Sequence, residues 1–436
     1  MRVSGRTAVT IAGSIEHSLH ASKRGPGEAL PSVRDLAATL SVSPATVATA
    51  YKLLRARGLV AGHGRRGTRV EPGRVTPASV APPVVPVGTV DLATGNPDPA
   101  LLASLTNAIQ SVEGRPRLYG DKPDHPGLAA FASTEFEADG VPARSVAVLS
   151  GAMDATERIL REHLRTGDRV AIEDPSFPGI IDLVAASGYG AVPFALDDDG
   201  PLPDAVAAAL GRGCSAIIVT PRAQNPTGAA VGPERAVELR RVLRGFPDVL
   251  LIENDYAGPV AGAPLHTLRN PSHERWAVVR STSKFLGPDL RVTVMAGDDT
   301  TLARVRGRQA LAARWVSHIL QQLALALWSD PSSGRRLARV GEIYAQRRNA
   351  ALAALGARNV EAHGCSGFNI WVPVRDEAGV VRALADRGWA VAAGERFRIQ
   401  AAPAIRITVS ALQPADADRL AGDLAEALRP AATGFA

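Results

Sequence analysis

The stretch VVRSTSKFLGPDLRV contains one lysine, Lys284, in a chain where four of the 49 basic residues are lysines. Lysine can lose its proton and attack a carbonyl as an amine, whereas arginine stays protonated in proteins. Ser281 and Ser283 precede this lysine, and Arg291 follows seven residues later. A lone lysine is usually a solvated surface residue, so a chemical role for Lys284 depends on what accompanies it.

Other residues that could do chemistry stand at the end of an apolar run or directly after it. The runs are SVAVLS, RVAIED, SAIIVTP, DVLLIEND, WAVVRST and RVTVMAG. Ser150, Gly151 and Ala152 stand after the first run at a predicted helix start, where a hydroxyl and two backbone N–H groups can bind a phosphate. Phe177 follows the second run, where an aromatic ring could cover a flat cofactor.

The third and fourth runs lead to an amide, Asn225, and to the pair Asp255 and Tyr256. A strand-end aspartate by itself is more often a cap or a loop anchor. As a set, however, a phosphate cradle, an aromatic ring, an amide, a carboxylate and a scarce lysine are what pyridoxal phosphate requires. Lys284 would form its Schiff base, and Asp255 would keep the pyridine nitrogen protonated, so that the ring acts as an electron sink. The phosphate clamp would be completed by Ser281, Ser283 and Arg291.

The elements that must position these residues form an alternating pattern. Several of the apolar runs are β-branched throughout, which is typical of strands covered on both faces of a sheet. Helical stretches, such as residues 154–164 and 234–243, lie between them. The pattern predicts an α/β domain with a mostly parallel sheet, whose working residues lie where the strands end.

Basic residues are concentrated at the N-terminus. Residues 1–75 contain 12 Lys and Arg against 4 Asp and Glu, whereas the remainder contains 37 against 39. A small basic module ahead of a near-neutral body indicates an anionic partner, and double-stranded DNA is the expected one. The alternative is a helical bundle whose charged face is only solvated.

Two helix signals follow each other within this module. Ser32 can cap a helix that runs to Leu40. Ser43 can cap a second helix, with Pro44 in its first position, and Gly58 can end it. Two short helices joined by a tight turn predict a helix-turn-helix, whose second helix enters the major groove by its N-terminal end.

Helical spacing divides the second helix into a buried and an exposed side. The residues expected to face inward are Val47, Ala50, Tyr51 and Leu54. The residues predicted to contact DNA, including three in the segment that follows, are Ser32, Arg34, Ala45, Thr46, Thr49, Lys52, Arg65, Arg66 and Thr68.

The segment that follows the second helix reads LVAGHGRRGTRV. Its glycines match G-x-G-x-x-G, but a dinucleotide site needs a strand before this motif and a helix after it. Here a helix precedes the motif and a proline-rich run follows. We therefore predict a β-hairpin wing, in which Arg65, Arg66 and Arg69 can reach phosphates or the minor groove.

Both parts of the chain resemble known families. LPSVRDLA, SPATVATAYKLL and GRRGT resemble the signatures of the GntR-type winged helix over about residues 8–72. From Asp91 to Leu428 the chain resembles the fold-type I aminotransferases, with SGAMDA, EDPSFPG, NPTG, NDYAG, STSKFLGPDLR and AIRITVS in the family's order. The combination resembles the MocR-type regulators, a branch of the GntR family.

The aminotransferase resemblance implies a role for each motif residue. Lys284 would carry the cofactor, Asp255 would contact the pyridine nitrogen, and Phe177 would stack on the ring. Asn225 and Tyr256 would contact the ring hydroxyl O3′. The phosphate would be held by Ser150, Gly151, Ala152, Ser283 and Arg291. Two further implied roles are phosphate binding in the neighbouring subunit by Tyr119 and binding of a substrate carboxylate by Arg406.

The predicted organisation has three parts. They are a winged helix-turn-helix (residues 1–72), a proline-rich linker (73–90) and an aminotransferase-like body (91–436), with a large part over about 91–330 and a small C-terminal α+β part over about 331–436. No apolar run of about 18 residues predicts a membrane span, and no secretion signal is evident, so a cytoplasmic protein is expected. The two cysteines predict neither a disulfide framework nor a zinc site, and no metal is expected.

The expected function is transcriptional regulation. The body would sense pyridoxal phosphate, or its aldimine with an amino-acid or amine effector, in a head-to-tail homodimer. The alternative is an active aminotransferase with an auxiliary DNA-binding module. NPTG stands here where many MocR-type regulators carry HQFPTG, and Arg406 is present, so transamination stays possible, although slow or absent turnover is expected.

Overall fold

The computed structural model describes residues 3–21, 28–56, 60–62, 67–70, 85–271 and 273–429. The chain divides into a smaller unit, which contains the described residues 3–70 and is called the N-terminal unit, and a larger unit, the body, which contains most of the described residues from Val85 onward. Most of the predicted linker, residues 73–84, lies outside the described residues.

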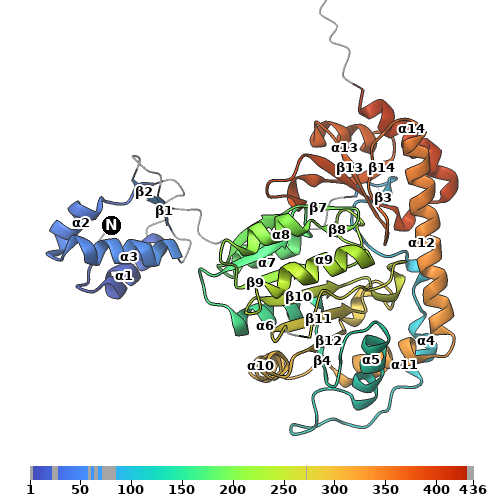
Figure 1. Cartoon of the computed structure of the whole chain (residues 1–436), viewed down its shortest axis with the longest axis horizontal. Helices are drawn as coiled ribbons and strands as arrows, with labels where there is room; N and C mark the ends of the chain where they lie inside the picture. Colours follow the sequence, from blue (N-terminus) through green and yellow to red (C-terminus); the bar gives the residue numbers. More distant parts are fainter. Residues whose placement is uncertain are drawn as a thin grey trace, which may run out of the picture. The chain divides into compact units, whose positions relative to one another are not determined.

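The N-terminal unit consists of three helices and a short hairpin (Figure 1). Its elements are α1 (Ala8–Ala21), α2 (Val33–Leu40), α3 (Pro44–Ala56), β1 (Val60–Gly62) and β2 (Thr68–Val70). The sequence motifs did not predict α1, which packs on α3 through Ile11 and Ile15, both fully buried. This third helix closes the small core beneath the helix-turn-helix.

Both predicted helix caps of the helix-turn-helix are confirmed. The Ser32 hydroxyl accepts a hydrogen bond from the Asp35 N–H (3.2 Å), and the Ser43 hydroxyl accepts one from the Thr46 N–H (3.1 Å). The turn between the helices contains Ser41 in the left-handed region (φ 53°). The predicted stop at Gly58 lies outside the described residues.

The predicted inward side of α3 is also confirmed, because its four residues are at most 1% exposed: Val47, Ala50, Tyr51 and Leu54. The Tyr51 hydroxyl donates to the Pro31 carbonyl (2.7 Å), and burial raises the pKa of Tyr51 to about 12. This bond ties α3 to the segment that leads into α2.

The predicted wing is an antiparallel hairpin, with Val60 opposite Val70 and Gly62 opposite Thr68. Leu30 N–H donates to the Thr68 carbonyl (2.8 Å), which joins the hairpin to the chain ahead of α2. The hairpin tip with Arg65 and Arg66 lies outside the described residues.

The body is organised around a seven-stranded sheet in the order β4-β12-β11-β10-β9-β5-β6. Its strands are β4 (Val146–Leu149), β5 (Arg169–Glu173), β6 (Gly190–Phe194), β9 (Ala216–Val219), β10 (Leu250–Asp255), β11 (Trp276–Ser281) and β12 (Thr293–Gly297). Strands β5, β9, β10 and β11 run parallel, whereas β12 is antiparallel to both of its neighbours. The six predicted apolar runs are all strands of this sheet. A short hairpin, β7 (Leu196–Asp197) and β8 (Gly200–Pro201), follows β6.

Helices connect these strands, as the α/β pattern predicted. Those that lie between two strands are α6 (Ala152–His163), α7 (Pro178–Ala186), α8 (Pro203–Leu210) and α9 (Pro233–Arg244). Helices α4 (Leu105–Ile109) and α5 (Pro126–Ala138) precede β4, and α10 (Asp299–Ala310) and α11 (His318–Ser329) follow β12. The two stretches predicted as helices over 154–164 and 234–243 correspond to α6 and α9. Helix α6 begins directly after β4, so its N-terminus lies at the edge of the sheet where the site residues were expected.

The C-terminal part of the body forms a second sheet, in the order β13-β15-β14-β3. Its elements are β13 (Asn369–Pro373), β14 (Trp389–Ala393), β15 (Ala404–Thr408), α12 (Ser333–Gly356), α13 (Glu377–Ala385) and α14 (Ala417–Ala427). In Figure 1 this sheet with α13 and α14 (red) lies above the central sheet, and α12 (orange) runs along both.

One predicted boundary needs correction. Strand β3 (Val90–Leu92) opens the body but pairs in parallel with β14 of the second sheet. The residues of β3, which were predicted to begin the large part of the body, therefore belong to its small C-terminal part. This is possible because a strand can pair with another strand that is distant in the sequence. A single apolar core runs through both parts and includes Val148, Val294 and Ile405.

None of the described helices is long and apolar enough to cross a membrane. Among the described residues, no group of three or more His, Cys, Asp or Glu could hold a metal ion.

Candidate cofactor site and DNA-binding module

A cavity of about 170 Å³ lies where β9, β10 and β11 end. It is lined by Ala152, Met153, Phe177, Thr220, Asn225, Asn254, Tyr256, Ser281, Ser283, Lys284 and Arg291. Eight of these eleven residues were predicted from the sequence as site residues. Parallel strands bring their carboxyl ends to one edge of the sheet, which gathers residues more than a hundred positions apart.

Lys284 is half-buried and lies in the middle of this set. Its Nζ donates a hydrogen bond to the carbonyl of Gly95 (2.8 Å), a partner that the sequence motifs did not identify. Burial and the positive charge of Arg406 lower the pKa of Lys284 to about 8. An amine with this pKa is partly unprotonated near neutral pH and is therefore available as a nucleophile.

One end of the cavity is built to hold an anion. The Ser281 hydroxyl donates to the Ser283 hydroxyl (3.1 Å), and Arg291 Nη2 donates to the Ser150 carbonyl (3.2 Å). Gly151 precedes the N-terminus of α6 at φ +113°, and a Cβ at this position would overlap the Arg291 guanidinium. The guanidinium and the first N–H groups of α6 can therefore both approach a bound phosphate.

The opposite side of the cavity contains an amide and a phenol. Arg406 is buried, and its Nη1 donates to the Asn225 Oδ1 (3.1 Å). The Tyr256 hydroxyl donates to the Ala223 carbonyl (2.5 Å). Arg406 does not line the cavity but bonds to Asn225, which does, so Arg406 lies behind Asn225. Tyr119 does not line the cavity either. Tyr119 is 81% exposed and packs against the ring of Trp315.

Asp255 lies outside the cavity, whereas its predicted role at the pyridine nitrogen would require it to line the cavity. Asp255 does not line the cavity but is fully buried between Arg222 and Arg280. Arg222 Nε lies 2.8 Å from Asp255 Oδ1, and Arg280 Nε lies 2.7 Å from Oδ2. The two guanidinium groups hold the pKa of Asp255 well below its ordinary value despite burial. Successive residues of a strand face opposite sides, so Asp255 points away from the side that Tyr256 faces.

That alternation also shows what the motif reasoning missed. Asn254 and Tyr256 are two residues apart on one strand, and both line the cavity. Asn254 is 5% exposed, and no described group hydrogen-bonds to its Oδ1. A period-two reading of the strand from Tyr256 would have identified Asn254, whereas no motif signal pointed to the other missed lining residues, Met153 and Thr220.

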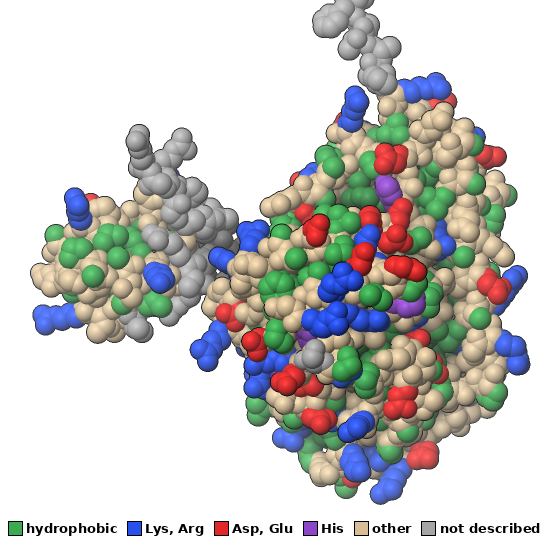
Figure 2. Space-filling model, viewed as in Figure 1, with side chains coloured by type: hydrophobic (Ala, Val, Ile, Leu, Met, Phe, Trp, Pro, Cys, Tyr) green, Lys and Arg blue, Asp and Glu red, His purple; other side chains and the backbone are tan. Residues whose placement is uncertain are grey.

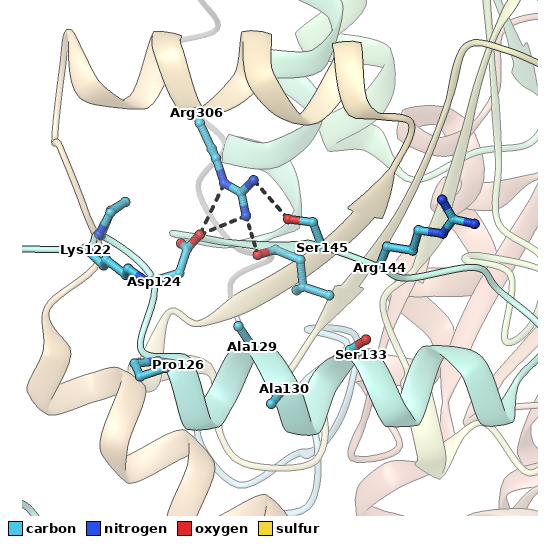
Figure 3. A pocket seen from close by; sticks show the side chains of 11 residues that line it. Lys122, Asp124, Pro126, Ala129, Ala130, Ser133, Arg144, Ser145 and Arg306 are labelled. Carbon is cyan, nitrogen blue, oxygen red and sulfur yellow. Dashed lines mark hydrogen bonds and ion pairs between the residues drawn. The ribbon is translucent and has the colours of Figure 1, made fainter.

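A second, more open cavity of about 630 Å³ lies between α5, α10 and the start of β4 (Figure 3). Arg306 points into it, but its guanidinium donates to Asp124 Oδ2 (3.1 Å), to the Ser145 hydroxyl (3.0 Å) and to the Val146 carbonyl (2.7 Å). These bonds join α10 to the chain ahead of β4. None of the predicted site residues lines this cavity, and we regard Arg306 as a structural clamp.

Seven of the nine residues predicted to contact DNA lie in the described part of the N-terminal unit, and Arg65 and Arg66 lie outside the described residues. Lys and Arg side chains project from this unit (Figure 2), and the exposed predicted residues are Ser32, Arg34, Ala45, Thr49 and Lys52. Three of the predicted residues have hydroxyl groups with local hydrogen-bond partners. The Thr49 hydroxyl donates to the Ala45 carbonyl (2.9 Å). The Thr46 hydroxyl lies 2.8 Å from the Ser43 hydroxyl, and the Ser32 hydroxyl donates to Asp35 Oδ2 (2.7 Å).

Comparison with known families agrees with both parts. The model for bacterial regulatory proteins of the gntR family matches residues 7–70, and that for aminotransferase class I and II matches residues 88–424. The fold and the site therefore define a GntR-type DNA-binding module joined to an aminotransferase-like body. The chain belongs to the MocR-type regulators, which are transcriptional regulators of the GntR family.

Individual relatives support this assignment. The chain is 37% identical over 431 residues to the vitamin B6 salvage pathway transcriptional repressor PtsJ of Salmonella typhimurium, covering 98% of this chain and 99% of that protein. It is 26% identical to the pyridoxine biosynthesis transcriptional regulator PdxR of Corynebacterium glutamicum, covering 84% and 83%. The solved structure of LysN, an alpha-aminoadipate aminotransferase from Thermus thermophilus, has the same fold as the body, with 23% identity, a TM-score of 0.70 and coverage of 78% and 92%.

Proposed function

We propose that the body binds pyridoxal phosphate at Lys284 and that this binding, alone or together with an amino compound, changes the affinity of the chain for double-stranded DNA. The observation that carries the proposal is one cavity in which a half-buried lysine of lowered pKa lies beside an anion-binding end. The same chain carries a helix-turn-helix. The names of PtsJ and PdxR, which refer to vitamin B6 and pyridoxine, support the same cofactor class.

The residues of the cavity fit pyridoxal phosphate. Ser281, Ser283, Arg291 and the N-terminus of α6 offer donors to a phosphate, and Phe177 offers a ring face. Asn225 and Tyr256 offer polar groups to the ring hydroxyl. When bound, the cofactor supplies an aldehyde that Lys284 can capture, and the protein contributes position and charge. The orphaned Asn254 Oδ1 is a further polar atom that a bound ring can reach.

The proposed effector is an amino acid or another amine. Arg406 lies behind Asn225, and its buried Nε–H has no hydrogen-bond acceptor among the described residues. A carboxylate that enters from the cavity side could exchange with Asn225 as its partner. Burial lowers the pKa of Arg406 to about 10, so it stays charged at neutral pH and suits an anionic ligand.

A homodimer is the proposed assembly. Tyr119 is exposed and does not line the cavity of its own chain, which suits a residue that reaches the phosphate of a neighbouring subunit. Two modules in a two-fold dimer would bind two half-sites, and the spacing between the half-sites would follow from the geometry of the dimer.

The proposal is tested with the purified full chain. Adding pyridoxal phosphate should produce a visible absorbance band, and borohydride reduction followed by peptide mass spectrometry should locate the cofactor on Lys284. DNA fragments from the region upstream of the chain's own gene are then titrated with and without the cofactor. A protein that stays colourless refutes cofactor binding, and DNA affinity that ignores a bound cofactor and added amines refutes sensing.

A further inference from the structure

The cavity around Lys284 is polar but lacks an acidic group. Of the described residues that line it, none is Asp or Glu, and the charged ones are Lys284 and Arg291. A carboxylate beside the pyridine nitrogen is what keeps this nitrogen protonated when the cofactor acts as an electron sink. The position next to the ring nitrogen must therefore be filled by something else.

The nearest candidates for such a carboxylate are held away from the cavity. Asp255 is enclosed by Arg222 and Arg280 on the other side of β10. Glu173, at the end of β5, accepts hydrogen bonds from the Thr220 N–H (2.8 Å) and from Gln224 Nε2 (3.0 Å). Burial raises the pKa of Glu173 to about 7, so it is only partly ionised near neutral pH, and it does not line the cavity.

Elimination among the uncharged lining residues leaves Asn254. The phosphate end and the lysine bind other parts of the cofactor, and Asn225 and Tyr256 lie at the edge proposed for its ring hydroxyl. Thr220 is engaged with Glu173 through both its N–H and its hydroxyl. Asn254 is nine-tenths or more buried, faces the same side of β10 as Tyr256 and has an amide oxygen that no described group satisfies. A rotation of the amide by 180° exchanges its oxygen and its nitrogen, so Asn254 can present its NH2 group as a donor to a ring nitrogen that carries no proton.

We infer that Asn254 faces the pyridine nitrogen of the cofactor and leaves it without a proton, so that the body retains an amino compound instead of transaminating it. The inference rests on the proposed function. A sensor and an aminotransferase can share almost all of their site residues, and by this inference Asn254 is the residue that makes the body a sensor.

The physical reason is the missing charge. Transamination breaks the Cα–H bond of the amine, and the electron pair left behind must be delocalised into the ring, which a protonated nitrogen accepts well. An opposite charge within reach typically shifts a pKa by about 1–3 units, so an aspartate would raise the protonated fraction of the nitrogen by up to about that many powers of ten. The neutral amide of Asn254 can donate or accept a hydrogen bond but supplies no such shift.

The test measures the protonation of the nitrogen directly. Full-length protein is loaded with pyridoxal phosphate carrying nitrogen-15 in the ring, and the nitrogen chemical shift is recorded at neutral pH. We expect the unprotonated value in the wild type and the protonated value in Asn254→Asp. Asn254→Ser, which also lacks a charge, should resemble the wild type. The wild-type spectrum alone decides the inference if Asn254→Asp does not fold.

A second readout follows the amine. After addition of L-alanine in the absence of a keto acid, conversion of the visible band to that of the pyridoxamine form should be at least about tenfold faster in Asn254→Asp than in the wild type. A protonated nitrogen in the wild type overturns the inference even though the cofactor is bound. A protein that binds no pyridoxal phosphate overturns the proposed function as well, so the two failures are distinguishable.

Discussion

The cluster of Asp255, Arg222 and Arg280 offers a stability test that also separates two roles for the aspartate. All three side chains are nearly inaccessible, with exposures of 0%, 6% and 2%. Removing one partner of a buried ion pair costs about 3–5 kcal/mol, because an uncompensated charge stays in the interior. Asp255→Asn leaves the two guanidinium groups with Asp139 as their carboxylate partner, so one positive charge becomes uncompensated and we expect a loss within that range.

The assay is urea unfolding of the full chain followed by tryptophan fluorescence. All five tryptophans lie in the body, between Trp276 and Trp389, so the signal reports the body and not the N-terminal unit. The matched control is Asp139→Asn, which removes a carboxylate that contacts the same arginines but is 29% exposed. We expect its cost to be at most about 2 kcal/mol, because water can reach this position.

The pH dependence has a defined sign. The pKa of Asp255 is lowered in the folded state, so its contribution to stability is present above the ordinary value of 3.8 and is lost as the pH falls toward the folded value. The difference between wild type and Asp255→Asn should therefore be full at pH 7 and shrink in acid. The reasoning is refuted if Asp255→Asn unfolds at the wild-type urea concentration but loses the cofactor band.

Three further predictions concern the cofactor, the DNA and the assembly. The rate of cofactor capture should rise about tenfold per pH unit below pH 8 and level off above it, because the amine of Lys284, with its pKa of about 8, must be unprotonated to react. Lys284→Ala should show no visible band, and a capture rate independent of pH would contradict this role. Lys52→Ala should weaken binding to all DNA sequences and lower the salt slope of log K by about 1, as expected of a phosphate contact. Thr46→Ala should instead alter the preference among sequences, as expected of a base contact. The reverse pattern in binding titrations would contradict both assignments. Tyr119→Phe should lower cofactor affinity without changing the sedimentation coefficient of the dimer, and a stable monomer with full cofactor occupancy would exclude a shared site.

Much of the architecture could be predicted because it depends on local patterns. Capping hydroxyls at Ser32 and Ser43 and the helical period from Val47 to Leu54 depend on neighbours within about two turns, and the structure confirms them. The apolar runs became the strands of the central sheet for the same reason, since strands covered on both faces must be apolar throughout. Charge asymmetry likewise needs no coordinates.

The cofactor site was predictable where motif and strand end coincide. Lys284, Asn225 and Tyr256 line the cavity because each follows or ends a parallel strand, and parallel strands end at one edge. The same reasoning failed one residue away. Motif order placed Asp255 in the site, although the alternation of side chains along β10 directs Asn254 there.

Tertiary structure alone decided the features that depend on distant partners. Arg222, just after β9, and Arg280, on β11, form ion pairs with Asp255, and the carbonyl of Gly95 accepts a hydrogen bond from Lys284. Strand β3 pairs with β14, which lies some three hundred residues later in the chain. A local pattern states which residue types are near in the chain and which side of an element they share. It does not state which charge or carbonyl the folded core brings opposite them, and that pairing determines whether a carboxylate serves the cofactor or the scaffold.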